Sequence, residues 1–389
     1  GVAATDIGTF KQDGKLTVLY NKKLVGAVDL DFLHHSLPKM ELKAEWAKPL
    51  PRILWREGTE SQKPAAPPKI ATALLELLQS PNITSKEKWV RAYDHEVQAA
   101  THQKPFVGKQ ADGPADSGVI WLYPHGGSKE SGVAIGCGLA PRLSLVDPYL
   151  MAQAAVDEAV RNVVVSGGNP DMCCLLDNFC WPDPVASLKN PQGAYKLGQL
   201  VRACRGLYAI CKAYGTPLVS GKDSMKNDFR GKNKRGDAIA VSVLPTLMVT
   251  AMAQVPMGCC VGSDFKNPGD MIYVLGAGGA QGLAGSEFSC RFIGNETAPS
   301  IDLEKNIELY RRLHQALKAR FIHSAHDLSE GGLLVAIAES MIGGRCGANI
   351  FAGIDFTCIG RVAEQDNLML SGGEAISLTA ITEAWKRGF

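Results

Sequence analysis

The segment His326-Asp327-Leu328-Ser329-Glu330-Gly331-Gly332 places carboxylates and an imidazole beside a hydroxyl and a glycine pair. An apolar run that begins at Leu333 predicts a helix directly after it. Helix N-termini attract anions, and Mg²⁺ binds one or two carboxylates beside phosphate oxygens. The segment therefore predicts a corner that holds a metal-bound polyphosphate. The alternative is a helix cap, in which Ser329 or Asp327 accepts a hydrogen bond from the first helical turn.

Further oxygen ligands occur on other predicted elements. The loop Asp112–Ser117 precedes a short apolar strand and carries two carboxylates, Asp112 and Asp116, but taken alone it is interpreted as a turn. Glu158 and Asn162 are one helical turn apart in a long predicted helix, so both lie on one face of it. The pair predicts two adjacent oxygen ligands. A solvated helix edge is the alternative.

A third polar corner follows the predicted strand Leu218–Val219. It contains Gly221, Lys222, Asp223 and Ser224. Backbone N–H groups and a lysine at a strand end can hold phosphate. The corner is not a Walker loop, because the first glycine of that pattern is missing and neither Ser nor Thr follows the lysine.

The elements that must position these residues alternate between strand and helix. Asp147 as N-cap and Pro148 as first residue predict a helix that runs to about Val165. Strands are predicted at 133–135, 172–176, 218–219, 239–243, 247–253 and 271–275, helices at 70–79, 86–91 (capped by Ser85), 198–214, 303–320 and after Gly332, and β-like structure at 357–380. This order predicts an α/β fold with mixed sheets.

Residues 1–46 predict a separate piece of β-structure. The apolar runs Leu16–Tyr20 and Leu24–Val28 flank a turn, which is the pattern of a hairpin. The string Thr5–Phe10 matches Thr357–Val362, with a leucine at the same distance beyond each. We interpret this echo as the tail of a preceding repeat, so that the chain is a fragment of a longer protein.

The composition excludes several classes of function. The 389 residues carry a net charge of +2, which favours neither nucleic acid nor a membrane surface as partner. The basic run Arg230–Arg235 is interpreted as a solvated loop. None of the 11 cysteines forms a C-x-x-C pair, and no apolar run is long enough to span a bilayer. We therefore expect reduced thiols and a cytoplasmic protein.

Together, the motifs closely resemble the large subunit of the phosphoribosylformylglycinamidine synthase family. The matching strings occur in family order along nearly the whole chain: Tyr93–Gln98, Asp112–Asp116, Asp147–Tyr149, Asp157–Asn162, Leu176–Trp181, Ser220–Ser224 and His326–Gly332. The resemblance implies an aminoimidazole ribonucleotide synthetase-like unit, with an N-terminal α/β domain built on a half-barrel-like sheet and a C-terminal α/β domain.

The resemblance also implies domain boundaries. Residues 1–46 correspond to the C-terminal strands of the preceding repeat, and residues 47–92 to a linker with helices. Residues 93–262 and 263–389 correspond to the two domains of the second repeat. The family has a longer stretch near 353–355, so we expect residues to be missing there.

The resemblance assigns roles to individual residues. It implies Mg²⁺ ligands at Asp116, Glu158, Asn162 and Asp327, and contacts to ATP or ADP at Asp177, Asn178, Lys222, Asp223 and Ser224. Gly138 and Ala140 stand where the family's first repeat has two histidines. No catalytic residue is therefore expected in this repeat, and the nucleotide is expected to be structural.

The implied activity is that of a purine-biosynthesis ligase. The family converts formylglycinamide ribonucleotide, ATP and ammonia to formylglycinamidine ribonucleotide, ADP and phosphate. The implied partners are the first repeat, this substrate, and a glutaminase domain or subunit that supplies ammonia; the isolated fragment is expected to be inactive and could form a homodimer. A free-standing aminoimidazole ribonucleotide or selenophosphate synthetase and a non-catalytic docking module remain alternatives.

Overall fold

The computed structural model describes residues 2–37, 39–47, 68–93, 95–96, 98–276, 282–293, 297–351 and 358–388. They form two compact units, residues 1–43 and 44–389. Asp94, residues 48–67 of the predicted linker and the expected gap near 353–355 lie outside the described residues.

The first unit is a hairpin followed by a short helix. Strands β1 (Lys15–Tyr20) and β2 (Lys23–Asp29) pair antiparallel, which confirms the predicted hairpin. The Asp29 carboxylate caps α1 (Leu30–His35), a helix that the apolar pattern alone did not predict. No residue of α1 is buried. A two-stranded hairpin with one short helix has no hydrophobic core of its own.

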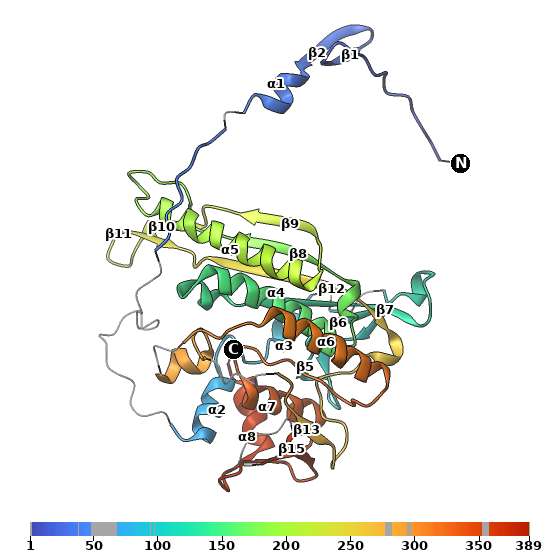
Figure 1. The fold of residues 1–389 in the computed structure, drawn as a ribbon, viewed down its shortest axis with the longest axis vertical. Helices are drawn as coiled ribbons and strands as arrows, with labels where there is room; N and C mark the ends of the chain where they lie inside the picture. Colours follow the sequence, from blue (N-terminus) through green and yellow to red (C-terminus); the bar gives the residue numbers. More distant parts are fainter. Residues whose placement is uncertain are drawn as a thin grey trace. The chain divides into compact units, whose positions relative to one another are not determined.

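The second unit contains a six-stranded mixed sheet with helices on one face (Figure 1). In spatial order the strands are β3 (Thr101–Gln103), β6 (Gly118–Trp121), β7 (Ser131–Leu139), β12 (Thr246–Pro256), β8 (Cys173–Cys180) and β9 (Leu218–Ser224). Helices α4 (Pro148–Val165), α5 (Gly193–Tyr214) and α6 (Leu303–Lys318) contribute to the core beneath it. Asp147 accepts the Tyr149 N–H at 2.9 Å, which confirms the predicted start of α4.

The C-terminal part forms a second core around a five-stranded sheet. Its strands in spatial order are β13 (Met271–Tyr273), β15 (Cys358–Ala363), β14 (Gly347–Ile350), β16 (Asn367–Met369) and β17 (Ala375–Ser377). Helices α2 (Ile70–Leu78), α7 (Leu333–Gly344) and α8 (Leu378–Lys386) pack into this core. The order of strands and helices confirms the predicted mixed α/β fold class.

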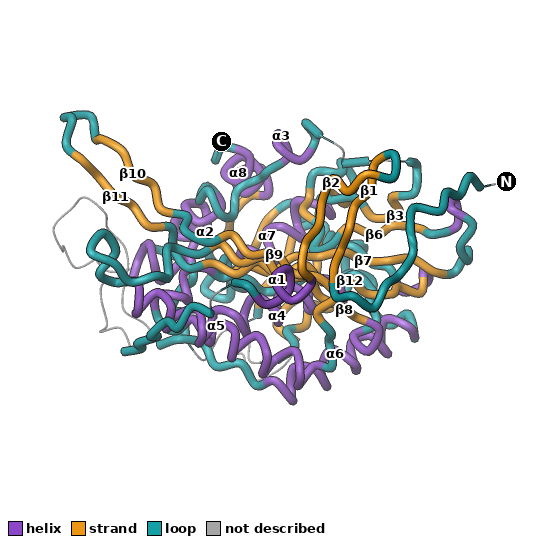
Figure 2. The backbone as a smooth tube through the Cα atoms, turned by 90° about the horizontal axis from the view of Figure 1, so that it is seen from above, coloured by secondary structure: helices purple, strands orange, loops and turns teal. Residues whose placement is uncertain are grey.

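Three local predictions were wrong. The end of the β-like stretch is helix α8, because Ser377 caps it and Leu378, Ile381 and Trp385 are buried at helical spacing. The basic run Arg230–Arg235 is not a simple loop. It begins in β10 (Asp228–Lys232), which pairs with β11 (Ala238–Ser242) in a hairpin that projects from the second unit (Figure 2).

The start of α3 (Glu87–Val90) also differs from the prediction. The N-cap residue is Lys86, one position later than the expected Ser85. The Ser85 hydroxyl nevertheless accepts the Glu87 N–H at 3.2 Å, so it still satisfies one free N–H of the first turn.

The chain enters the second unit along α5. Trp46 stacks on Tyr195 with ring centroids 5.6 Å apart, and the Arg202 guanidinium lies 4.8 Å from the Trp46 ring. Arg202 Nε also donates to Asp147 Oδ1 at 2.8 Å. Since Asp147 caps α4, this contact connects the entering segment to the helix that carries Glu158 and Asn162.

Candidate functional site

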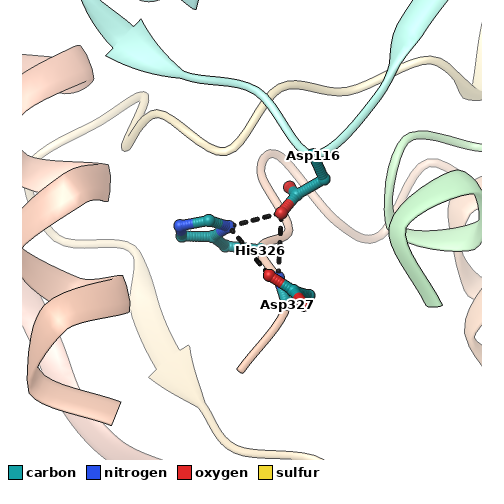
Figure 3. Close-up of side chains that lie close together, drawn as sticks. All are labelled: Asp116, His326 and Asp327. Atoms are coloured by element: carbon teal, nitrogen blue, oxygen red, sulfur yellow. Dashed lines mark hydrogen bonds and ion pairs between the residues drawn. The ribbon is translucent and has the colours of Figure 1, made fainter. Parts of the chain in front are cut away.

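Side chains from two distant segments meet at the loop that precedes α7 (Figure 3). Asp116 lies between β5 (Gly113–Pro114) and β6, whereas His326 and Asp327 belong to the loop itself. His326 Nδ1 is 2.7 Å from Asp116 Oδ1, and the Asp327 N–H donates to the same oxygen at 3.3 Å. Ligand atoms of the three residues lie within 4.8 Å of one another.

Helix α4 brings Glu158 to the same loop. Glu158 Oε1 accepts the Ser329 hydroxyl at 3.0 Å, and its Oε2 accepts the Leu139 N–H at 2.7 Å. The Ser329 hydroxyl also contacts Asp327 Oδ2. Ser329 and Asp327 do not cap α7, since its N-cap is Gly332 and no side chain bonds to the first turn. The helix-cap alternative is therefore wrong.

Asn162 lies on the same face of α4 and is only 8% exposed, which excludes a solvated edge. Its Nδ2 donates to Cys137 O at 2.8 Å. Its Oδ1 is buried and has no hydrogen-bond partner among the described residues. A Cβ added at Gly136 would lie 3.0 Å from Asn162 Cβ and 3.4 Å from Asp116 O, so these two residues are neighbours. We define the acidic cluster as Asp116, Glu158, Asn162 and Asp327.

The acidic cluster has the ligand chemistry that Mg²⁺ requires. Three carboxylates and one amide offer oxygen atoms, and a buried amide oxygen without a partner is costly unless a donor or a cation satisfies it. A bound divalent cation would therefore satisfy oxygen atoms that the four side chains do not satisfy among themselves.

Electrostatics supports this interpretation. Burial, reinforced by Glu330 and Asp327, raises the pKa of Glu158 to about 8. Burial likewise raises the pKa of Asp116 to about 6, although His326 opposes the shift. Burial would raise the pKa of Asp327 too, but Arg161 and His326 outweigh it and lower that pKa. The carboxylates therefore repel one another, and a bound cation would relieve the repulsion.

The thermal stability of the metal-free protein is expected to fall as the pH rises from about 5 to about 8. The raised pKa values of Glu158 and Asp116 mean that the folded chain retains protons that the unfolded chain has already released. The pKa of His326 is lowered by burial but raised more by Asp116 and Glu339, which acts in the same direction. Melting temperatures in EDTA across this range test the sign, and a steady rise with pH would contradict it.

Two protein-family models match this chain. The N-terminal domain of AIR synthase related protein matches residues 115–255, and the C-terminal domain of AIR synthase related protein matches residues 267–385. These ranges cover about two thirds of the 389 residues. The chain belongs to this family.

A curated relative agrees with the resemblance seen in the motifs. Phosphoribosylformylglycinamidine synthase subunit PurL of Parasynechococcus marenigrum is 34% identical over 367 residues, which are 90% of this chain and 45% of that protein. The predicted resemblance is thereby confirmed. The chain spans less than half the length of this relative.

Two solved structures share the fold of this AIR synthase related chain. T. maritima PurL complexed with FGAR has a TM-score of 0.54 at 16% identity and covers 81% of this chain and 54% of its own. T. maritima PurL complexed with ATP has a TM-score of 0.50 at 17% identity, with coverage of 91% and 46%. At these identities the likeness concerns the fold alone, and it confirms the predicted synthetase-like architecture.

Besides Arg161, sequence reasoning missed two charged residues that interact with the loop before α7 or with α7 itself. Glu339 Oε2 lies 3.0 Å from His326 Nε2, so His326 bridges Glu339 and Asp116. The available signal was that Glu339 is the one charged residue in the apolar helix α7. Lys86 is half-buried, and burial lowers its pKa against the opposing effect of Glu339, Glu330 and Glu287. Its sequence context carried no such signal.

The predicted phosphate corner, Gly221–Ser224, is not a corner, because strand β9 continues to Ser224. Asp177 and Asn178 lie on the neighbouring β8, and β12 separates these two strands from β7. Asn178 pairs with Lys222, and Asp177 pairs with Gly221 in the parallel register. Lys222 and Asp223 are exposed, while Ser224 is half-buried. Within the described parts of the chain, no hydrogen bond or ion pair links these side chains to the acidic cluster.

Gly138 and Ala140, where the resemblance places the family's two histidines, differ in their surroundings. Gly138 lies in β7 beneath α4, and an added Cβ there would be 2.0 Å from Ala155 O and 2.5 Å from Ala159 N. Contact that close with helix backbone leaves no room for any side chain. Ala140 follows the strand and is half-buried. The first histidine place is therefore closed by the packing of α4.

Proposed function

We propose that this chain is the nucleotide-holding second half of a phosphoribosylformylglycinamidine synthase large subunit. The observation that carries the proposal is the convergence of Asp116, Glu158 and Asp327, with the unpartnered Asn162 oxygen beside them. The predicted domains at 93–262 and 263–389 contain the two family matches, at 115–255 and 267–385.

In this proposal, the acidic cluster holds Mg²⁺ on the phosphates of ATP or ADP. The cation would supply the charge that offsets the buried carboxylates and binds phosphate oxygens. Asp177, Asn178, Lys222, Asp223 and Ser224 are proposed to contact the nucleotide from β8 and β9. With Gly138 closed off and Ala140 apolar, this half lacks the histidine acid or base, so the nucleotide is held without turnover.

The whole protein is proposed to form formylglycinamidine ribonucleotide from formylglycinamide ribonucleotide, ATP and ammonia, with a glutaminase domain or subunit as the ammonia source. T. maritima PurL, which shares this fold, has been solved with ATP and with FGAR. We expect the isolated chain to lack this activity. All 11 cysteines are free, which supports a cytoplasmic location. The described residues include no helix long and apolar enough to cross a membrane.

The six-stranded sheet supports a preceding repeat as partner. The face of the sheet opposite α4 carries half-exposed or exposed side chains in rows that run across β7, β12 and β8: Ile135, Met252 and Cys174, then Cys137, Thr250 and Leu176. A sheet normally covers such an apolar face with another layer. A second copy of the chain could cover it in the absence of the first repeat, which gives the homodimer.

The first unit supports the same partner. Its large apolar side chains are exposed, among them Leu16, Val18, Phe32 and Leu33. In a free-standing synthetase this hairpin would leave its apolar side chains exposed. As the tail of a preceding repeat, the hairpin would bury them against the other strands of that repeat.

Nucleotide analysis tests the proposal. The full chain, purified in Mg²⁺ without added nucleotide, is denatured, and the released small molecules are separated by ion-pair chromatography. We expect about one ADP or ATP per chain, or stoichiometric uptake of added Mg-ADP if the protein is isolated empty. A protein that neither releases nucleotide nor gains thermal stability from Mg-ADP would overturn the proposal.

A further inference from the structure

We propose that Arg161 is a positioning residue for the acidic cluster, and that the buried Asp157 holds Arg161 in place. Arg161 would keep one oxygen of Asp327 oriented toward Asp116 without binding the cation itself. The inference rests on the proposed Mg²⁺ site, and it names the side chain that connects the two segments from which the site is built.

Arg161 connects α4 to the loop before α7 through one guanidinium group. Its Nη2 donates to Asp327 Oδ2 at 3.3 Å and to Leu328 O at 3.2 Å, while its Nη1 donates to Asp157 Oδ2 at 2.5 Å. Arg161 directly precedes Asn162 and follows Glu158 by almost one helical turn. A planar fork of donors can hold two acceptors in a set geometry, which a single ammonium cannot do.

Asp157 is itself restrained from two other helices. Its Oδ1 accepts Tyr310 OH at 2.8 Å and Asn306 Nδ2 at 3.1 Å, both from α6, and it also accepts Tyr214 OH from α5. The two tyrosine rings meet edge to face with centroids 6.1 Å apart. A buried carboxylate with this many donors has little freedom to move, so it fixes the end of Arg161 that it binds.

The two carboxylate oxygens of Asp327 have different contacts. Oδ2 accepts from Arg161 and Ser329, whereas Oδ1 is turned toward the histidine, 3.9 Å from His326 Nδ1 (Figure 3). The arginine thus restrains the carboxylate through one oxygen and leaves the other on the side of Asp116. This is the arrangement expected of a group that orients a metal ligand.

The sign of one measurement separates positioning from simple charge. A cation beside a metal site repels the metal, so removing it should raise metal affinity if Arg161 acts only through its charge. If Arg161 orients Asp327, then Arg161→Met should lower the affinity of the full chain for Mn²⁺ alone by about tenfold or more. Binding of free Mn²⁺ is measured by the loss of its EPR signal, with no nucleotide present.

Further variants protect the test from misfolding. Arg161→Lys keeps the charge beside Asp157, so we expect the variant to fold. A lysine cannot contact Asp157 and Leu328 O together, so we expect its Mn²⁺ affinity to be lowered about threefold to tenfold. Arg311→Met is the matched control, because Arg311 makes a similar 2.8 Å contact to Asp171 on the exposed side of α6. We expect its Mn²⁺ affinity to equal that of the unaltered chain.

The outcomes are distinguishable from failure of the proposed function. If the unaltered chain does not bind Mn²⁺, the metal site itself is wrong. If the unaltered chain binds Mn²⁺ and both Arg161 variants bind it equally well or more tightly, only the positioning role is overturned. A weakened affinity in Arg161→Lys at an unchanged melting temperature would support it most directly.

Discussion

Glu158→Gln is expected to stabilise the metal-free protein while it weakens binding of Mg-ADP. The pKa of Glu158 is raised to about 8 by burial, by Glu330 and by Asp327, so at neutral pH the fold favours the uncharged form. A glutamine supplies that form permanently and should add about 2 kcal/mol to the free energy of unfolding. The same change removes a carboxylate from the proposed Mg²⁺ ligands and should cost about 3 kcal/mol, or about a hundredfold, in nucleotide affinity.

The opposite signs make this prediction specific. Urea unfolding in EDTA measures the stability, and isothermal titration with Mg-ADP measures the affinity. Glu308→Gln is a matched control, because Glu308 is an exposed residue whose partner is Arg312 on the same helix. We expect neither quantity to change in the control. If Glu158→Gln lowered stability and left affinity intact, Glu158 would be a structural residue.

Gly138→Ala is expected to destabilise the protein by about 3 kcal/mol, and Gly138→His by more. The added Cβ would approach the α4 backbone at Ala155 to 2.0 Å, and a backbone cannot move aside as a side chain can. Helix α4 would have to shift, and Glu158 and Asn162 would shift with it. A histidine therefore does not fit at position 138 by substitution alone.

Urea unfolding of the two variants tests this expectation. Gly372→Ala is the control, because an added Cβ at Gly372 would meet nothing within 4 Å. We expect Gly372→Ala to unfold at the urea concentration of the unaltered chain. A Gly138→Ala protein with unchanged stability and unchanged Mg-ADP affinity would show that α4 adapts. It would contradict the claim that the packing of α4 leaves no room for a side chain at position 138.

The long elements were predictable because their signals are local. Asp147 and Pro148 determine the start of α4 through a cap and a preset φ, and the alternating apolar residues determine β7 and β12. Helix α8 was not predicted, and its first three residues, 378–380, were included in the β-like stretch, because its helical burial depends on the core around α2 and α7. Short elements such as β10 contain too few residues for a periodic signal.

The site was predictable only in part. The side-chain types predicted oxygen ligands in the corner His326–Gly332, the turn spacing added Glu158 and Asn162, and the resemblance to the family added Asp116. The sequence did not predict roles for Glu339, Lys86 and Arg161, because their roles depend on contacts with residues far away in the chain. The predicted corner at β8 and β9 forms as strands but makes no side-chain bond to the acidic cluster within the described residues.

The sequence by itself determined the class of fold, the family and the oxygen-bearing residue types of the candidate site, since caps, periodicity and residue types act over a few residues. Only the tertiary structure decided that Asp327 and Ser329 do not cap α7, that α4 is buried rather than solvated at Asn162, and that Gly138 has no room for a side chain. Each of these depends on which segments pack against one another. Which segments pack together depends on how the whole chain buries its apolar residues, and a local sequence pattern does not carry that information.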